Sequence, residues 1–348
     1  MKTLQLFGLM TLAVVALQAQ PTTGAQYWST SVPDCSSLGE NAVTITNAAG
    51  TTVGYSCYVS GTFVWLAAGG TWGSSIRVGA PASGAIGVDY SFYDASGKNL
   101  NLDARVGTTA ASGNDVNFAL NKNQPSEVRL LGAPGEAPAY GTTQTGSVYA
   151  VFYCPDANTC SSVLPQLLYS FIPIKPWSLS VPIAWDYYFS SIQAQGAWSQ
   201  WSAEGIDDGG THLVSLVIYN WDTVATIFTV RVYDSSGNLV GTGTTPSIPP
   251  VPVLSDGSYG EGGTYGTLLS KLIPTPLPSG IFKVLIDGGS NYSSVAVLQF
   301  NGDSATSLQV AYDSAPGGSS TAAASTQMSV KRTRTTAKTR QQFGTLAK

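Results

Sequence analysis

The sequence predicts an all-β protein made of two tandem antiparallel β-sandwiches, and three observations lead to this prediction. Only 10% of the residues are charged, while glycine, serine, threonine, valine and tyrosine are abundant, a composition that suits pleated strands joined by tight turns. Short segments alternate apolar and polar residues at a period of two, and no long segment carries an apolar stripe at a period of 3.6. The chain also contains an internal repeat and is long enough for two domains that each bury a core.

The internal repeat becomes visible when the chain is shifted by 140 residues. Gly69-Gly70-Thr71 then aligns with Gly209-Gly210-Thr211, and Tyr93-Asp-Ala-Ser-Gly97 aligns with Tyr233-Asp-Ser-Ser-Gly237. Between these segments the apolar alternation keeps its phase, so we expect the same strand face to be buried in both copies. The Asp-x-Ser-Gly that follows each strand predicts a hairpin turn, in which aspartate caps its own backbone and glycine adopts a positive φ. A calcium loop is the alternative, but it needs further oxygen ligands that are missing here.

Further short strands are expected in both copies, most of them bounded by glycine, proline, asparagine or serine. In the first copy they are Val43–Thr46, Val53–Val59, Ser74–Val78, Val116–Leu120, Glu127–Leu131 and Val148–Tyr153. In the second copy they are Val214–Tyr219, Ile281–Ile286, Val295–Phe300 and Ser307–Tyr312. Many short strands with frequent turns are typical of an antiparallel sandwich.

Composition divides the chain into four expected segments. Residues 1–19 have the features of a secretory signal peptide: a positively charged N-terminus, a short apolar stretch and small residues at the expected cleavage site. The alternative is an uncleaved membrane anchor, which needs about 20 apolar residues. Residues 24–175 and 176–313 are expected to form the two sandwiches, with a proline-rich boundary between them. Residues 314–348 lack large apolar side chains and are expected to form a disordered basic tail. After signal cleavage we expect no membrane span, and a protein that is secreted or held at the cell surface.

The formal net charge is −4, but the charged residues are distributed unevenly along the chain. None of the 20 acidic residues lies beyond Asp313, whereas six of the 16 basic residues do. The basic tail is therefore expected to attract anionic surfaces nonspecifically, with an affinity that falls as salt rises. Its one aromatic residue is Phe343, so specific nucleic-acid recognition is not expected.

Four cysteines in an exported chain indicate two disulfides, and their spacing favours the local pairs Cys35–Cys57 and Cys154–Cys160 among the three possible pairings. The second pair would close a short loop of turn-forming residues. A zinc site is the competing interpretation, but the chain has a single histidine and no Cys-x-x-Cys. No metal and no cofactor are expected.

The residues do not favour an enzyme. His212 is the only histidine and begins an expected strand, and no Gly-x-Ser-x-Gly accompanies it. Glu204, Asp207 and Asp208 lie near tryptophans in the sequence, which leaves a carboxylate-dependent extracellular hydrolase as a minor alternative. No glycine-rich phosphate loop opens a helix, so nucleotide chemistry is excluded.

Aromatic residues crowd around the boundary between the two copies, and six of them are the candidate ligand-binding residues. They are Trp177, Trp185, Tyr187, Tyr188, Trp198 and Trp201. An exposed aromatic platform would suit a polysaccharide, whereas buried rings would pack the interface between two sandwiches, which is the interpretation we favour. The expected function is that of a structural or adhesive protein whose partner is a polysaccharide or a surface protein. A carbohydrate-binding module is the alternative.

Several motifs of the second copy resemble those of a known family of repeats. They are Gly209-Gly-Thr-His-Leu-Val-Ser-Leu-Val-Ile-Tyr-Asn220, Val230-Arg-Val-Tyr-Asp-Ser-Ser-Gly-Asn-Leu-Val240, Gly280-Ile-Phe-Lys-Val-Leu-Ile-Asp287 and Val295-Ala-Val-Leu-Gln-Phe300. These segments resemble the tandem immunoglobulin-like β-sandwich repeats of exported bacterial proteins, many of which have no assigned activity. The first copy is similar more loosely, through Glu127-Val-Arg-Leu130 and Gly146-Ser-Val-Tyr-Ala-Val-Phe-Tyr153. The resemblance implies two immunoglobulin-like sandwiches and supplies no catalytic residues.

Overall fold

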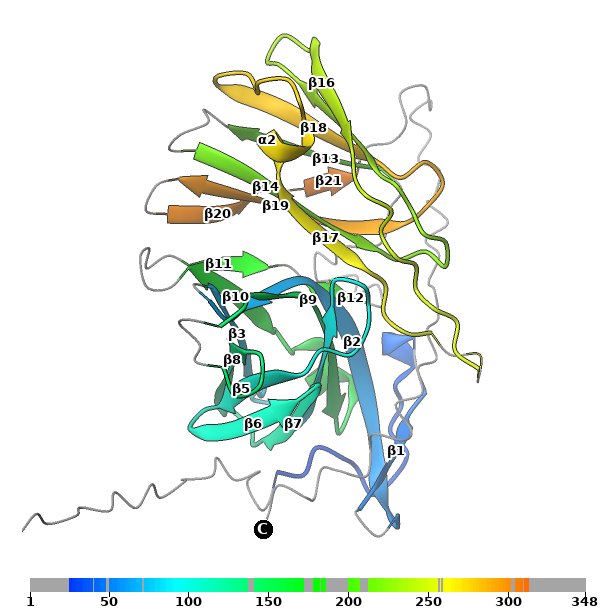
Figure 1. The fold of residues 1–348 in the computed structure, drawn as a ribbon. Coiled ribbons are helices and arrows are strands. Elements are labelled where there is room, and N and C mark those ends of the chain that lie inside the picture. Colours follow the sequence, from blue (N-terminus) through cyan, green and yellow to red (C-terminus); the bar gives the residue numbers. More distant parts are fainter. Residues whose placement is uncertain are drawn as a thin grey trace, which may run out of the picture.

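The computed structural model describes residues 25–39, 41–47, 50–70, 72–136, 141–171, 178–181, 183–185, 200–206, 212–255, 257, 259–301, 304–308 and 310–312. Within these ranges, nearly all regular structure is antiparallel β-sheet (Figure 1), which confirms the all-β prediction. The helical elements are one 3-10 turn, η1 (Ser36–Leu38), and two short helices, α1 (Ala157–Ser161) and α2 (Leu269–Leu272). None of the described helices is long and apolar enough to cross a membrane. The expected signal peptide and basic tail lie outside the described residues.

Two sheets form a first sandwich, in the lower half of Figure 1. Sheet 1 has the strand order β1-β2-β9-β4-β7, with β12 beside β2, and sheet 2 has the order β11-β10-β3-β8-β5-β6. The strands are β1 (Val43–Thr46), β2 (Thr52–Ala68), β3 (Trp72–Gly79), β4 (Ile86–Asp94), β5 (Leu102–Val106), β6 (Thr109–Gly113), β7 (Asp115–Leu120), β8 (Pro125–Gly132), β9 (Gln144–Cys154), β10 (Gln166–Phe171), β11 (Ser178–Val181) and β12 (Ile183–Trp185). Both sheets contribute to one apolar core, for example through Tyr90 and Phe152 of sheet 1 and Ile76 and Leu130 of sheet 2.

Two further sheets form a second sandwich, in the upper half of Figure 1. Sheet 3 has the order β16-β15-β18-β13-β21, and sheet 4 has the order β17-β14-β19-β20. The strands are β13 (Gln200–Ile206), β14 (His212–Asn220), β15 (Thr229–Tyr233), β16 (Leu239–Thr244), β17 (Thr264–Leu268), β18 (Ile281–Asp287), β19 (Ser293–Asn301), β20 (Ser304–Leu308) and β21 (Val310–Tyr312). Nine of the ten strands expected from the sequence lie within an observed strand. The tenth, Ser307–Tyr312, overlaps β20 and β21, and residue 309 between them lies outside the described residues.

The two sandwiches share a common set of strand pairings. The order β12-β2-β9-β4 in sheet 1 corresponds to β21-β13-β18-β15 in sheet 3, and β11-β10-β3-β8 in sheet 2 corresponds to β20-β19-β14-β17 in sheet 4. Every one of these pairings is antiparallel, and the corresponding strands follow each other in the same order along the chain. The repeat in the sequence is therefore accompanied by a repeat in topology.

The first two strands after the expected boundary at residues 175 and 176 pair within sheets 1 and 2. Strand β11 pairs with β10 and strand β12 pairs with β2, so residues 178–185 belong to the sheets of the first sandwich. The first strand of the second sandwich begins at Gln200.

The aligned hairpin turns adopt the same conformation in both sandwiches. The Asp94 carboxylate accepts hydrogen bonds from the backbone amides of Ser96 (2.8 Å) and Lys98 (3.0 Å). The Asp234 carboxylate accepts the equivalent bonds from Ser236 and Asn238, both at 2.9 Å. The glycine in each turn has a left-handed backbone, with φ of 80° at position 97 and 82° at position 237.

Strands β14 and β19 of sheet 4 are buried on both faces and join the two sandwiches. Along β14, Leu216 and Ile218 point into the core of the second sandwich, whereas Val217 and Tyr219 belong to the core cluster of the first. Strand β19 alternates in the same way. Because successive side chains of a strand point to opposite faces, a sheet covered on both sides needs apolar residues at nearly every position. This explains the nearly continuous apolar sequence of β14.

Candidate functional site

Of the six aromatic residues named as candidate ligand-binding residues, the structure describes the side chain of Trp201 alone. Trp201 is 2% exposed, lies in the core of the second sandwich and donates a hydrogen bond from Nε1 to the Ser293 carbonyl at 3.1 Å. Its assignment as a ligand-binding residue is therefore replaced by a packing role. Trp185 lies on β12, where its backbone pairs with Gly61. Trp177, Tyr187, Tyr188 and Trp198 lie outside the described residues.

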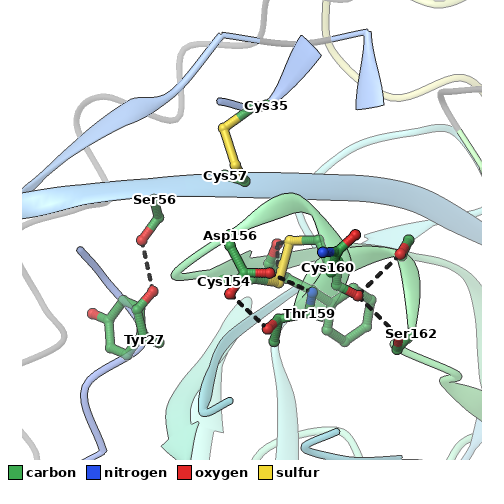
Figure 2. The surroundings of a disulfide bond; sticks show 12 residues. Tyr27, Cys35, Ser56, Cys57, Cys154, Asp156, Thr159, Cys160 and Ser162 are labelled. Atoms are coloured by element: carbon green, nitrogen blue, oxygen red, sulfur yellow. Dashed lines mark hydrogen bonds between the residues drawn. A yellow bond between two sulfur atoms is a disulfide. The ribbon is translucent and has the colours of Figure 1, made fainter. Parts of the chain in front are cut away.

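Both disulfides are present in the local pairing that the spacing favours (Figure 2). Cys35 and Cys57 tie η1 to strand β2, and Cys154 and Cys160 tie the end of β9 to α1. The turn of the second bridge is capped by Asp156, whose carboxylate accepts the backbone amide of Thr159 at 2.8 Å. Two disulfides indicate an oxidising, extracellular environment, because such bonds rarely persist in the cytosol.

Among the candidate catalytic residues, the structure describes the side chain of Glu204 alone. His212 is the first residue of β14, and the exposed Glu204 lies opposite Lys283 on the neighbouring strand β18. Asp207 and Asp208 lie outside the described residues. Among the residues that the structure describes, no three histidine, cysteine, aspartate or glutamate side chains are placed to hold a metal ion.

A different site is built by the long proline- and glycine-rich loop of residues 245–263, which runs from the second sandwich onto the first. Asn220 fixes the base of this loop: its Nδ2 donates to the carbonyls of Val224 (2.9 Å), Ile248 (3.1 Å) and Pro249 (3.2 Å). The tip is a small hairpin, in which the Gly260 amide donates to the Pro252 carbonyl at 2.8 Å. The described part of the loop is thus held by backbone hydrogen bonds.

The loop meets the first sandwich at the hairpin turn that ends strand β4. The Thr264 amide donates to the Ala95 carbonyl at 3.0 Å, and the Thr264 hydroxyl donates to the Val64 carbonyl at 2.8 Å. A β-carbon on Gly97 would lie 2.3 Å from the carbonyl oxygen of Glu261, so only glycine permits this approach. The turn therefore serves both as the end of a hairpin and as a docking point between the sandwiches.

A cleft of about 600 Å³ lies between this loop and the outer face of sheet 1. Its floor is formed by the outward residues Asp89, Ser91 and Tyr93 of β4, together with Tyr149 and Val151 of β9. The core-facing residues of β4 lie between them, as the period of two requires. Three of the floor positions, Asp89, Tyr149 and Val151, are themselves largely buried, at 7%, 5% and 3% exposure.

The opposite wall and the rim come from the loop and the turn. Pro252, Leu254, Tyr259 and Glu261 line the wall, and Gly97, Lys98 and Asn99 form the rim. Glu261 is 1% exposed and accepts a hydrogen bond from the Tyr219 hydroxyl, which in turn accepts the Gly262 amide at 2.9 Å. This chain of hydrogen bonds holds the wall against β14.

The cleft combines three tyrosine rings with two carboxylates and one ammonium group. Aromatic rings offer flat apolar surface, and the polar groups beside them select the orientation of a polar ligand. The sequence predicts the turn at Gly97 but not its contact with the loop, since Tyr93 and Tyr259 are 166 residues apart. The one signal available was the insertion of the loop in the second copy, because long ordered loops are frequently functional.

Comparisons of the chain with protein-family models, with curated proteins and with solved structures found no match.

Proposed function

We propose that this protein is an exported, non-enzymatic binding protein of the cell surface or medium, made of two tandem immunoglobulin-like sandwiches, and that it holds a carbohydrate in the cleft between them. The observation that carries the proposal is the cleft itself, which is lined by Tyr93, Tyr149 and Tyr259 together with Asp89, Lys98 and Glu261. Sugars present apolar ring faces and many hydroxyl groups, so tyrosines that alternate with charged groups suit them. Adhesion through a glycan then follows as the biological role.

The immunoglobulin-like character is supported by the six strand pairings, among eight strands, that recur in the same order in both sandwiches. Export is supported by the two disulfides and by the signal-like composition of residues 1–19. Junctions between domains are common places for ligand pockets, because two surfaces form a concave site that neither forms alone.

Hydrolysis of the bound glycan is the second candidate, because Asp89 and Glu261 both line the cleft and glycoside hydrolysis uses paired carboxylates. The burial and hydrogen bonding of Glu261 favour binding without hydrolysis. Its carboxylate is almost fully buried and accepts the Tyr219 hydroxyl as part of the wall. A general acid must instead reach the leaving-group oxygen of the substrate.

The test is calorimetric titration of the full chain with a panel of neutral oligosaccharides, combined with substitutions of cleft tyrosines. Y93A and Y259A should each weaken binding about tenfold, the effect expected when an interface tyrosine contributes roughly 1–2 kcal/mol. Y233A is the matched control, because Tyr233 is also half-buried and precedes the same turn in the second sandwich, away from the cleft.

Two results would count against the proposal. If no oligosaccharide binds, or if Y233A weakens binding as much as Y93A does, the cleft is not a carbohydrate site. If reducing ends are released during long incubation and D89N abolishes the release, the hydrolase candidate replaces the binding protein.

A further inference from the structure

The outer face of sheet 2 concentrates arginines, beside the two carboxylates Asp103 and Glu127, in an otherwise acidic part of the chain. Up to Asp313 the chain beyond residue 19 contains nine basic and 20 acidic residues. It has four arginines, and three of them, Arg77, Arg129 and Arg105, lie on the adjacent strands β3, β8 and β5 of this sheet. All three are exposed, whereas their neighbours along each strand, such as Ile76, point into the core or are less exposed.

The strand register places two of these arginines directly opposite each other. Arg105 of β5 is the cross-strand partner of Arg129 of β8, and Arg129 is in turn the partner of Ser75 on β3. Like charges directly opposite each other on one sheet face repel and destabilise the pair. A face that keeps such a pair exposed is suited to an anion that lies across both guanidinium groups.

Glu127 organises this face. Its Oε1 accepts from the Arg77 Nε at 3.0 Å and from the Ser75 hydroxyl at 3.0 Å, and its Oε2 accepts from the Arg129 Nε at 2.7 Å. Partial burial raises the pKa of Glu127, but the bonds from Arg129, Arg77 and Ser75 outweigh it and hold the pKa below its usual value. One carboxylate thus orients two arginines from neighbouring strands.

A shallow groove of about 490 Å³ runs beside this network. Arg77 and Glu127 line it together with Ser126, Gln166 and the exposed Leu164. The groove therefore offers hydroxyl, amide and apolar contacts next to the guanidinium groups.

We propose that the outer face of sheet 2 is a second binding surface, which takes an acidic, carboxylated polysaccharide through Arg77, Arg105 and Arg129. The planar fork of arginine matches the two oxygens of a carboxylate, and spaced carboxylates along a polymer match arginines on successive strands. A single-stranded nucleic acid fits less well, since it needs rings on which its bases stack. Along the described strands β3, β8, β5 and β6, the outward positions carry no aromatic side chain.

The test measures binding of the full chain to immobilised polygalacturonate, with neutral dextran and single-stranded oligothymidylate as comparisons. Wild-type protein should bind polygalacturonate with an affinity that falls as salt rises, and should not bind dextran. R105Q/R129Q should lower the affinity at least about tenfold. K271Q/K283Q is the matched control, because it removes two exposed positive charges from the second sandwich and should change affinity less than about twofold.

A third variant separates an organised site from simple charge attraction. E127Q adds one unit of positive charge to the face but removes the carboxylate that orients Arg77 and Arg129, so the affinity should fall. Tighter binding of E127Q, or equal losses in the arginine and lysine pairs, would show that net charge alone drives binding and would overturn the proposal. Tighter binding to oligothymidylate than to polygalacturonate, lost in R105Q/R129Q, would assign the face to nucleic acid instead. The basic tail is present in every variant, so its contribution cancels.

The surface is independent of the cleft. Y259A should leave binding to polygalacturonate unchanged, and R105Q/R129Q should leave binding of neutral oligosaccharides unchanged. Each proposal therefore stands or fails by its own variants.

Discussion

Gly97 of the first sandwich lies so close to Glu261 of the second that a β-carbon at position 97 would be 2.3 Å from the glutamate carbonyl oxygen. Gly237 occupies the same place in the equivalent turn, has nearly the same φ, and has no atom within 4 Å of its added β-carbon. The two glycines share one conformational requirement and differ in their surroundings. Comparing substitutions at the two glycines therefore separates the strain within the turn from the effect of the contact between the sandwiches.

The first prediction uses this pair. G237A should lower the free energy of unfolding by about 1 kcal/mol, the usual effect of a left-handed non-glycine residue. G97A should lower it by about 3 kcal/mol, because overpacking against the Glu261 backbone adds to the same strain. Urea unfolding followed by circular dichroism measures both, and equal effects of the two substitutions would contradict the observed contact.

The second prediction concerns Asn220, whose side chain is fully buried and bridges three carbonyls at the base of the loop. N220A should lower stability by about 2 kcal/mol, since buried carbonyls lose their hydrogen-bond donor. It should also accelerate protease cleavage within residues 245–263. N238A, in an exposed turn, serves as control, and cleavage at the wild-type rate in N220A would show that the loop is held by other contacts.

The third prediction compares the two disulfides. Cys35 and Cys57 are separated by 22 residues and Cys154 and Cys160 by 6. Constraining the longer loop removes more entropy from the unfolded chain, so C35A/C57A should cost about 3 kcal/mol and C154A/C160A about 2 kcal/mol. Denaturant midpoints in the reverse order would mean that native-state packing around the shorter bridge outweighs the entropy of the unfolded chain.

The fourth prediction concerns acid unfolding. Partial burial raises the pKa of Asp287, but hydrogen bonds from the Gly289 amide, Arg231 and Gln200, together with the charge of Arg231, bring the pKa below its usual value. A lowered pKa in the folded state stabilises the protein above the unfolded-state value of about 3.9, and this stabilisation is lost as the pH falls toward the folded-state value. The stability difference between wild type and D287N should therefore be constant from pH 7 to 5 and shrink below pH 4.

The pKa of Asp115 is shifted in the opposite direction to that of Asp287, so the same experiment should give a stability change of the opposite sign. Partial burial raises its pKa, so the folded state holds that proton more tightly and the protein loses stability as the pH rises through the folded-state value. D115N should gain stability relative to wild type at neutral pH, and this gain should disappear in acid. Parallel pH profiles for D115N and D287N would contradict the different surroundings of the two carboxylates.

Sequence patterns were sufficient where the determining interactions are local. The alternation of apolar residues in β4 and β14, the Asp-x-Ser-Gly turns and the spacing of the cysteines all act within one strand or one hairpin, and each predicted its element. Strands β6 and β16 were missed, because their short sequences are rich in small residues and carry little alternation. Strands β5, β10, β13 and β17 were also missed. The placement of residues 178–185 was also missed, since their pairing with β2 and β10 depends on chain segments far away.

The sequence by itself thus determined the all-β class, the repeat and the pairing of the cysteines, because backbone periodicity and turn chemistry are read from neighbouring residues. Tertiary structure alone decided that Trp201 fills a core, that the loop reaches the turn at Gly97, and that Arg105 faces Arg129. Each of these depends on strand register or on the docking of distant segments. A shift of one residue in register would send the same side chains to the opposite face.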